Sequence, residues 1–160
     1  KKMWNRLIIG SDHAGFERKE EVKSLLTRMK IDVTDVGTTS AEAVDYPDFG
    51  CQVAERVSSG EFPAGILLCG AGVGMTIVAN KFPGIRAALC LDTYTAEMCR
   101  RHNDANVLIL AGRRTDSATM EKIVKLWLST EFEGGRHQRR LDKIREIEEK
   151  RGKGTEPCQN

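Results

Sequence analysis

Short apolar runs alternate with longer stretches of mixed polarity along this chain. Three of the runs, residues 7–10, 66–68 and 107–111, contain no polar residue. Such runs are typical of strands buried on both faces of a parallel sheet. Two further strands are expected at residues 31–36 and 85–91. The pattern therefore predicts five strands.

The stretches between these strands carry apolar residues at helical spacing. One example is the stripe of Val22, Leu25, Leu26 and Met29, which predicts a helix with one buried face. Strands that alternate with helices predict an α/β fold. Four of the expected helices span residues 16–29, 48–59, 73–81 and 92–101. A fifth is capped at residues 115–117 and ends near 128, and a last one begins within 133–140 and ends near 151.

This alternation predicts a three-layer sandwich built on a parallel sheet. We expect the strand order 2-1-3-4-5 with right-handed crossovers, a common order for five strands. The loop after the first strand would then lie beside the loop after the third, at the edge where such sheets bind ligands. Asp12 and His13 would face Cys69 across one cleft.

One domain over residues 1–151 accounts for this pattern, because no repeat or linker interrupts it. The last helix has a narrow apolar stripe of Leu141, Ile144 and Ile147. A stripe of that kind suits packing on a partner subunit. Residues 152–160 are expected to form a flexible tail.

Composition narrows the choice of partners and compartment. The 160 residues are 40% hydrophobic and 30% charged, with a net charge of +2, so the charge balance does not indicate nucleic-acid binding. No apolar run reaches the ~18 residues of a membrane span. The five cysteines are odd in number and lack zinc-finger spacing. This usage predicts reduced thiols in a cytoplasmic protein without a structural metal.

The segment after the third strand carries the strongest chemical signal. It reads Cys69-Gly70-Ala71-Gly72-Val73-Gly74 and leads into a helix. Glycines let backbone amides approach a ligand, and the first amides of a helix have no internal partner, so this turn suits an anion. A thiol among such dipoles is a candidate base or nucleophile.

Other interpretations of the glycine turn stay open. The Gly-Lys-Ser/Thr ending of a Walker A loop is absent, and Met75 stands where a dinucleotide fingerprint needs its third glycine. Met75 also stands where a cysteine phosphatase loop needs arginine, although Asp92 has the spacing of a ribose-binding acid. A plain tight turn with Cys69 as a small buried residue fits as well. Asp12, likewise, could simply cap the next helix.

Basic residues gather where the last helix begins. Arg136, Arg139 and Arg140 surround His137, although cations oppose the helix dipole at that end. Arginine binds phosphate oxygens bidentately. These residues, with Arg113 after the fifth strand, are therefore candidates for a phosphate site, and a solvated helix start is the alternative.

Several separate stretches combine into one specific pattern. They are Asp12-His13-Ala14-Gly15, Asp45-Tyr46-Pro47, Cys69-Gly70-Ala71-Gly72-Val73-Gly74, Asn80-Lys81 with Gly84-Ile85-Arg86-Ala87, His102-Asn103-Asp104, and Glu133-Gly134-Gly135-Arg136-His137 with Arg140. In this order and spacing they resemble ribose-5-phosphate isomerase type B, a family that also contains galactose-6-phosphate and allose-6-phosphate isomerases. The resemblance extends over about residues 6–150.

The resemblance implies a Rossmann-like homodimer, or a tetramer, that interconverts ribose 5-phosphate and ribulose 5-phosphate in the pentose phosphate pathway without a cofactor or metal. Cys69 would move a proton between C2 and C1, and His102 would open the sugar ring. The glycine turn would hold the enediolate, and the arginines chiefly the phosphate. The substrate-binding residues implied by the resemblance are Asp12, His13, Gly70, Ala71, Gly72, Val73, Gly74, Asn103, Arg113, Arg136, His137 and Arg140.

These residues suit an aldose–ketose isomerisation. That reaction needs one group to remove a proton beside a carbonyl and return it to the neighbouring carbon. It also needs hydrogen-bond donors where the enediolate charge develops, and ring opening suits histidine. Ala71 is a departure, since the family often has Thr or Ser there. Either amides and a water suffice, or activity or substrate preference is altered.

The position of His102 raises a geometric difficulty. It precedes the fifth strand, so within one chain it should lie near the end of the sheet opposite Cys69. We therefore expect a site shared between two subunits related by a two-fold axis. His102 and Asn103 would reach the glycine turn of the partner subunit.

Three alternative functions stay open at this point. The first is the same chemistry on a hexose 6-phosphate, allose or galactose 6-phosphate. The second is a non-catalytic regulatory domain that binds a nucleotide or anion with the glycine turn and the arginines. The third is a redox-sensing protein in which Cys69 is oxidised, although no second cysteine stands near it in the sequence.

Overall fold

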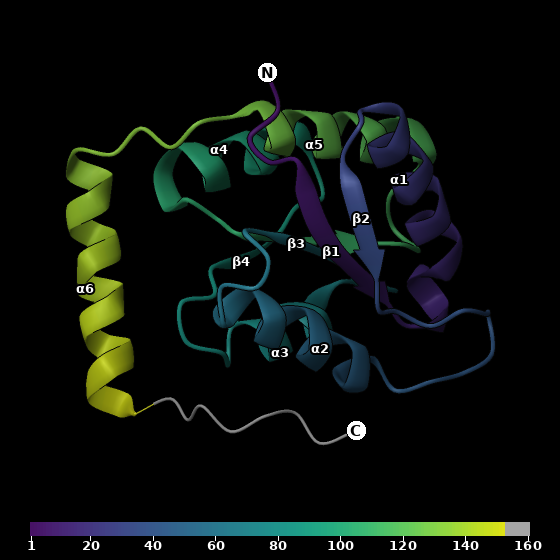
Figure 1. Ribbon diagram of the computed structural model, residues 1–160, viewed down its shortest axis with the longest axis horizontal. Helices are drawn as coiled ribbons and strands as arrows, with labels where there is room; N and C mark the ends of the chain where they lie inside the picture. Colours follow the sequence, from purple (N-terminus) through teal and green to yellow (C-terminus); the bar gives the residue numbers. More distant parts are fainter. Residues whose placement is uncertain (153–160) are drawn as a thin grey trace.

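Five parallel strands form the centre of the computed structural model, which describes residues 1–152 (Figure 1). They pair in the order β2-β1-β3-β5-β4, and every neighbouring pair is parallel. The predicted α/β class with a five-stranded parallel sheet is confirmed. The strands are β1 (Arg6–Ser11), β2 (Asp32–Asp35), β3 (Gly65–Cys69), β4 (Ala87–Leu89) and β5 (Val107–Ala111).

The order of the last two strands differs from the predicted 2-1-3-4-5. β5 lies between β3 and β4, with Leu110 opposite Leu68 on one side and Ile109 opposite Leu89 on the other. All five residues of β5 are buried, whereas the three residues of β4 are half-buried. A strand in the interior must be apolar on both faces, and an edge strand need not be. Burial, and not chain order, therefore decides which strand takes the edge.

Helices cover both faces of the sheet and complete the predicted three layers (Figure 1). Leu108 and Leu110 of β5 belong to the core on one face, while Ile109 belongs to the core on the other, because side chains alternate along a strand. The first face packs against α1 (Phe16–Arg28), α4 (Thr93–Asn103) and α5 (Ser117–Ser129), and the second against α2 (Tyr46–Ser58) and α3 (Val73–Ala79).

Two local differences from the prediction affect the functional residues. α4 continues to Asn103, so His102 and Asn103 lie in its last turn and not in a polar loop. The chain leaves that turn at Asp104, which has a left-handed backbone with φ of 47°. A short 3-10 helix, η1 (His13–Gly15), stands between β1 and α1, where the sequence pattern predicted a polar loop.

The last helix, α6 (Arg136–Arg151), stands apart from the body of the molecule (Figure 1). Leu141 and Ile144 line a cavity of about 360 Å³ between α6 and the β4–α4 side. Ile144 is nevertheless 49% exposed and Ile147 62% exposed. The apolar stripe is thus only partly covered within the chain, and its packing on a partner subunit stays a prediction.

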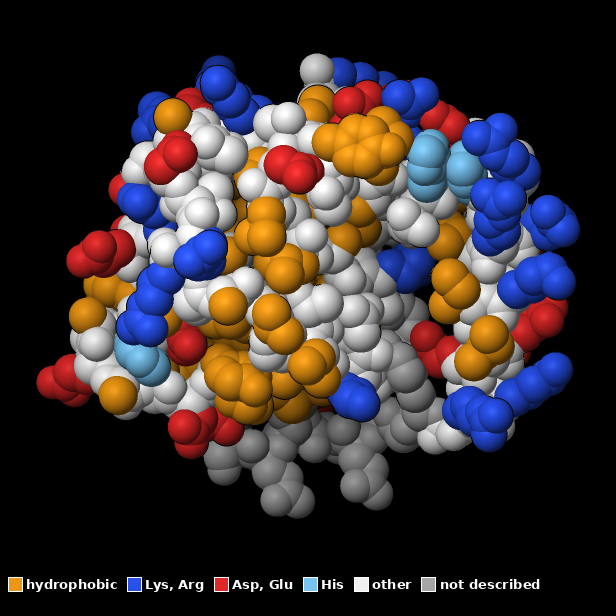
Figure 2. Space-filling view, turned by 180° about the vertical axis from the view of Figure 1, so that it is seen from behind, with side chains coloured by type: hydrophobic (Ala, Val, Ile, Leu, Met, Phe, Trp, Pro, Cys, Tyr) orange, Lys and Arg blue, Asp and Glu red, His pale blue; other side chains and the backbone are white. Residues whose placement is uncertain are grey.

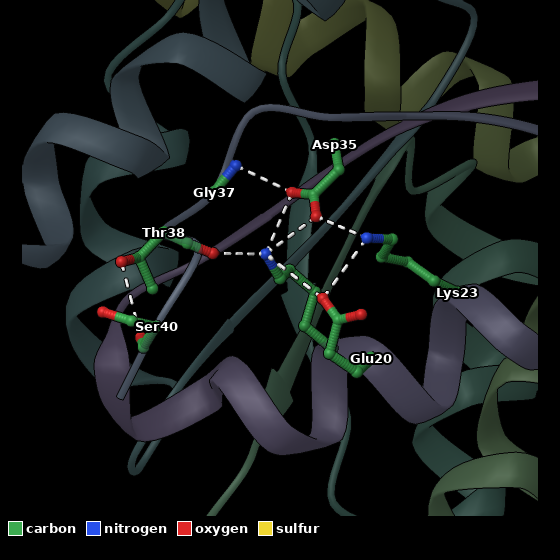
Figure 3. A network of polar contacts seen from close by, with 7 residues as sticks. Glu20, Lys23, Asp35, Gly37, Thr38 and Ser40 are labelled. Atoms are coloured by element: carbon green, nitrogen blue, oxygen red, sulfur yellow. Dashed lines mark hydrogen bonds and ion pairs between the residues drawn. The ribbon is translucent and has the colours of Figure 1, made fainter. Parts of the chain in front are cut away.

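A buried lysine fixes the loop that follows β2 (Figure 3). Lys19 Nζ donates hydrogen bonds to both carboxylate oxygens of Asp35, at 3.1 and 2.8 Å, and to the carbonyl of Thr38 at 2.6 Å. Lys23 Nζ donates to the same carboxylate at 2.8 Å, and so does the amide of Gly37. Burial opposes ionisation of Asp35, but these bonds outweigh burial and lower the pKa of Asp35. The network ties the loop to α1.

A second buried cation holds the end of α4. The Arg100 guanidinium donates to Asp104 Oδ1 at 2.8 Å, to the Ala105 carbonyl at 2.8 Å and to the Thr130 carbonyl at 3.2 Å. It also lies 4.8 Å from the ring centroid of Trp4. A buried charge is tolerated when it is paired and hydrogen-bonded. Arg100 therefore joins α4 to the segment that leads toward α6.

The predicted tail, residues 152–160, falls outside the described residues except for Gly152. Among residues 1–152, no helix is both long enough and apolar enough to span a bilayer.

Candidate active site

The turn between β3 and α3 requires glycine for its backbone. Gly72 has a φ of 81° directly before α3, a conformation that L side chains rarely adopt. The ring of Tyr46 lies so close to Gly74 that a Cβ there would collide with it. The first amides of α3 have no acceptor inside the helix, so this turn presents donors at the carboxyl edge of the sheet.

Cys69 stands at the last position of β3, immediately before that turn. It is 5% exposed, and its thiol is free, as are those of Cys90 and Cys99. Its carbonyl accepts a hydrogen bond from the amide of Gly112 at 2.8 Å.

Asp12 and His13 approach the same edge from the end of β1. The Asp12 carboxylate accepts from the amide of Gly15 at 3.1 Å and caps η1, as the simpler interpretation of that residue expected. Nδ1 of His13 accepts from the amide of Val44 at 3.1 Å. A ring nitrogen that accepts carries no proton, so a neutral His13 holds its proton on Nε2.

Arg113 completes the group at this edge. Its amide donates to the Gly70 carbonyl at 3.1 Å, and its side chain passes over Gly70. A cavity of about 290 Å³ opens between Arg113 and His13. We call this group the thiol cluster; it comprises Asp12, His13, Cys69, Gly70, Ala71, Gly72, Val73, Gly74 and Arg113.

The remaining predicted residues gather elsewhere, where α4 ends and α6 begins. The rings of His102 and His137 stack, with centroids 4.2 Å apart and planes at 11°. His137 is 5% exposed, and His102 is half-buried. We call this group the histidine cluster; it comprises His102, Asn103, Arg136, His137 and Arg140.

Charged groups around the histidine cluster have opposite effects on the pKa of His137. Glu133 Oε2 lies 3.5 Å from His137 Nε2, and Arg101 Nε donates to Glu133 Oε1 at 2.6 Å. Burial, then His102, Arg136 and Arg140 lower the pKa of His137, while Glu133 opposes that effect. The Arg101 bond chiefly lowers the pKa of Glu133. At neutral pH the group therefore holds a neutral His137 beside an ionised carboxylate.

Three predicted arginines have no carboxylate partner among residues 1–152. Arg113, Arg136 and Arg140 form none of the ion pairs found in that part of the chain, in contrast to Arg100 and Arg101. All three are exposed. Their guanidinium groups are therefore available for an anionic ligand such as a phosphate.

The two clusters lie at opposite ends of the strands of the sheet. Cys69 is the last residue of β3, at the carboxyl ends of the strands, whereas His102 lies before β5, at their amino ends. Five residues of strand separate these ends by roughly 15 Å. Figure 2 shows two histidines together beside the basic residues of α6 and the third histidine across the face. One chain therefore does not bring all the predicted residues together.

Three residues that contact these clusters have no role predicted from the sequence. Tyr46 packs on Gly74, Val44 orients His13, and Glu133 faces His137. Tyr46 and Glu133 stand inside motifs that carry the resemblance, which is the one signal that pointed to them. His102, Glu133 and His137 also offer ligand atoms within 4.8 Å of one another, close enough to hold a metal ion.

Comparisons with known proteins agree with this architecture. The sequence profile described as Ribose/Galactose Isomerase matches residues 7–144. Ribose-5-phosphate isomerase B of Escherichia coli K12 is 45% identical over 146 residues, which cover 91% of this chain and 98% of the relative.

Solved structures are similar over nearly their whole length. Ribose-5-phosphate isomerase B of Clostridium thermocellum superposes with a TM-score of 0.90 at 51% identity, covering 91% of this chain and 99% of the other. The enzyme of Mycoplasma genitalium with bound ribulose-5-phosphate has a TM-score of 0.88 at 40% identity, covering 93% and 99%.

Proposed function

The chain belongs to the ribose/galactose isomerase family and is a sugar-phosphate isomerase, and from that membership we propose that it interconverts ribose 5-phosphate and ribulose 5-phosphate by metal-free proton transfer. The observation that carries the proposal is the free Cys69 thiol at the end of β3, directly before a turn of backbone donors. Relatives named for this reaction support the choice of substrate.

Cys69 is the proposed base. Its thiolate removes the proton from C2 of the open-chain aldose, and the electron pair of that C–H bond forms the C1–C2 double bond of an enediolate. The thiol then returns the proton to C1, and the carbonyl forms at C2. Amides of the Gly70–Gly74 turn stabilise the negative oxygens, because donors fixed in advance act where charge develops. A proton also passes from O2 to O1, and the Cys69 thiolate is regenerated, so the cycle balances.

His102 is the proposed acid and base for opening the sugar ring. Ribulose 5-phosphate cannot close a five-membered ring, because its O5 carries the phosphate. A variant without His102 should therefore lose more activity toward ribose 5-phosphate than in the reverse direction. A loss that is equal in both directions would contradict this role.

The proposed assembly is a homodimer in which the histidine cluster of one subunit completes the thiol cluster of the other. The separation of the clusters within one chain supports this arrangement. Exposed apolar residues supply surface for it, namely Val73 and Ile77 on α3 and Ile144 and Ile147 on α6. An isologous interface would form two identical sites. Residues 1–151 would then act as one domain.

Substrate binding would draw on both clusters in this assembly. Asp12, His13 and Asn103 would contact the sugar, while Arg113, Arg136 and Arg140 would hold the phosphate. Binding of this remote group contributes energy that aligns the reacting carbons. The absence of ion pairs on these arginines within residues 1–152 supports the assignment.

The test is conversion of ribose 5-phosphate in the presence of EDTA by the intact protein, Cys69→Ala and Cys90→Ala. Cys90 is a buried free thiol outside both clusters and serves as the matched control, with circular dichroism as a check of folding. We expect turnover by the intact protein and the control, and none by Cys69→Ala. Equal turnover by all three would exclude Cys69 as the base.

Ala71 favours a parallel assay of allose and galactose 6-phosphates. It is exposed in the glycine turn, and its small side chain leaves room for a longer sugar. A higher kcat/KM on a hexose 6-phosphate than on ribose 5-phosphate would replace the proposed substrate. No turnover of any of these sugars would favour a binding domain instead.

A further inference from the structure

Three metal-ligating side chains meet where α4 and α6 approach each other. His102 lies in the last turn of α4, His137 in the first turn of α6, and Glu133 in the connection that precedes α6. One ligand atom from each lies within 4.8 Å of the other two. Two imidazoles and one carboxylate form a ligand set that Zn²⁺ uses when it keeps one position open.

A second observation points to a ligand at this place. His137 Nε2 is buried and has no hydrogen-bond partner within residues 1–152, and the His137 residue is 5% exposed. Leaving such a nitrogen unpaired is unfavourable, and most buried polar atoms in proteins do have a partner. The nitrogen faces Glu133 Oε2 at 3.5 Å, so a cation between them would satisfy both.

We propose that His102, Glu133 and His137 form a binding site for one divalent cation of the zinc class in each chain. Imidazole and carboxylate ligands favour Zn²⁺, Co²⁺ or Ni²⁺ over Mg²⁺ and Ca²⁺, which take oxygen ligands. Within one chain the site is separate from the thiol cluster, which lies at the other end of the strands.

Binding requires a change in the histidine stack. The two rings are nearly parallel, at 11°, so their lone pairs run side by side and do not converge on one ion. His102 is half-buried and His137 is buried, so His102 is the ring that turns. Cation binding therefore separates the stacked pair.

Neighbouring arginine side chains limit the affinity of this site for a divalent cation. Arg101 holds the other oxygen of Glu133 at 2.6 Å, and Arg136 and Arg140 lie close enough to lower the pKa of His137. Their charges repel a divalent cation. We therefore expect a weak site. A phosphate bound by Arg136 and Arg140 would offset that repulsion and strengthen cation binding, provided that the phosphate does not itself contact His102.

The direct test is calorimetric titration of the full chain with Zn²⁺. The variants are Glu133→Gln and His137→Asn, and the matched control is Glu131→Gln. Glu131 lies two residues from Glu133, is exposed and pairs with Lys1, so the control makes the same charge change outside the site. We expect one ion per chain in the intact protein and the control. Both site variants should lose at least tenfold in affinity, since even the loss of a residue behind a metal ligand costs 10–100-fold.

Co²⁺ spectroscopy separates this site from a thiol site. Bound Co²⁺ should show no thiolate charge-transfer band, and Cys69→Ser should bind as the intact protein does. A thiolate band, loss of binding in Cys69→Ser, no binding at all, or equal binding by the site variants and the control would each overturn the proposal.

An effect on catalysis rests on the proposed function, because it requires His102 to open the sugar ring. Zn²⁺ would then inhibit turnover of ribose 5-phosphate, and EDTA would reverse the inhibition. The two proposals fail separately. Metal binding with the expected variant pattern in a protein that turns over no sugar phosphate would retain the site and overturn only the isomerase mechanism.

Discussion

The thiol cluster and the histidine cluster are held in place by different means. Backbone hydrogen bonds between neighbouring loops fix the thiol cluster, as in the bonds from the amides of Gly112 and Arg113 to the carbonyls of Cys69 and Gly70. A ring stack and ion pairs between side chains hold the histidine cluster, which depends on where α6 lies. The sheet edge is thus complete within one chain, while the second cluster sits on a helix whose apolar face is still partly exposed.

The thiol cluster depends on the fold of one chain alone, whereas the histidine cluster depends on the position of α6. Donors on a sheet edge are placed by the fold itself, and such placement suits the charge-stabilising part of a reaction. Side chains on a separate helix can serve a second subunit. Variants that change one cluster at a time test this difference.

The largest expected effect comes from mixing two inactive variants. Cys69→Ala and His102→Ala should each lower kcat/KM for ribose 5-phosphate by about 10²–10⁴-fold, the range of general acid–base contributions. If the clusters meet across a two-fold axis, subunit exchange forms hybrids with one intact site, and an equal mixture recovers about a quarter of the native activity. Turnover is measured before and after exchange.

Mixing each variant with itself is the control for that experiment. No recovery in the exchanged mixture, with hybrids demonstrated by native mass spectrometry, would mean that both clusters act within one chain. The histidine cluster would then not serve a second subunit.

The next effect tests the rigidity of the thiol cluster. Gly74→Ala places a methyl group in the space of the Tyr46 ring, and such overpacking is unfavourable by about 1–3 kcal/mol. We expect kcat/KM to fall roughly 10–100-fold, with partial recovery in the double variant with Tyr46→Ala. The control variant is Gly70→Ala, since a Cβ there makes only ordinary contacts, at 3.5 Å from Ala14 and Arg113. Its thermal unfolding should show no comparable loss of stability.

A smaller effect is expected at the start of α6. Arg136→Ala should raise KM for ribose 5-phosphate about tenfold, because a hydrogen bond to a charged group contributes roughly 1.5–3 kcal/mol. Arg139→Ala removes the same charge from the same helix and should have little effect. Equal changes in KM for the two variants would indicate a general field and no specific contact with phosphate.

The smallest effect concerns the loop beside the thiol cluster. The pKa of Asp35 lies below its ordinary value of 3.8 because the bonds from Lys19, Lys23 and Gly37 outweigh burial. Its contribution to stability is therefore present above pH 3.8 and is lost as the pH falls through the lowered pKa. We expect Asp35→Asn to reduce the free energy of unfolding by about 1–2 kcal/mol at pH 7.

Urea unfolding at pH 7 and near pH 3 measures this effect. The difference between the native protein and Asp35→Asn should shrink at the lower pH. A difference that stays constant between the two pH values would mean that the carboxylate charge does not hold this loop. Asp116→Ala, which removes the cap of α5, gives a comparison in which the lost bond lies far from the network.

The thiol cluster could be predicted from sequence because its signals are local. A strand, a thiol and alternating glycines stand consecutively, and parallel-sheet topology assigns their edge. The histidine cluster depended on the resemblance, since His102 and His137 belong to helices whose contact no local pattern encodes. The stack and the role of Glu133 were therefore not predicted. The strand order was missed because chain order was followed, although the wholly apolar β5 and the short β4 carried the signal.

The placement of β5 inside the sheet has a consequence for biosynthesis. β4 pairs with β5 and not with β3, so β4 has no neighbouring strand until residues 107–111 have left the ribosome. Until then β3 is an open, apolar edge of a three-stranded sheet, the kind of surface that pairs with other chains. Closure of the fold is therefore a late event in translation, and a nascent chain stalled before β5 would present this edge to chaperones.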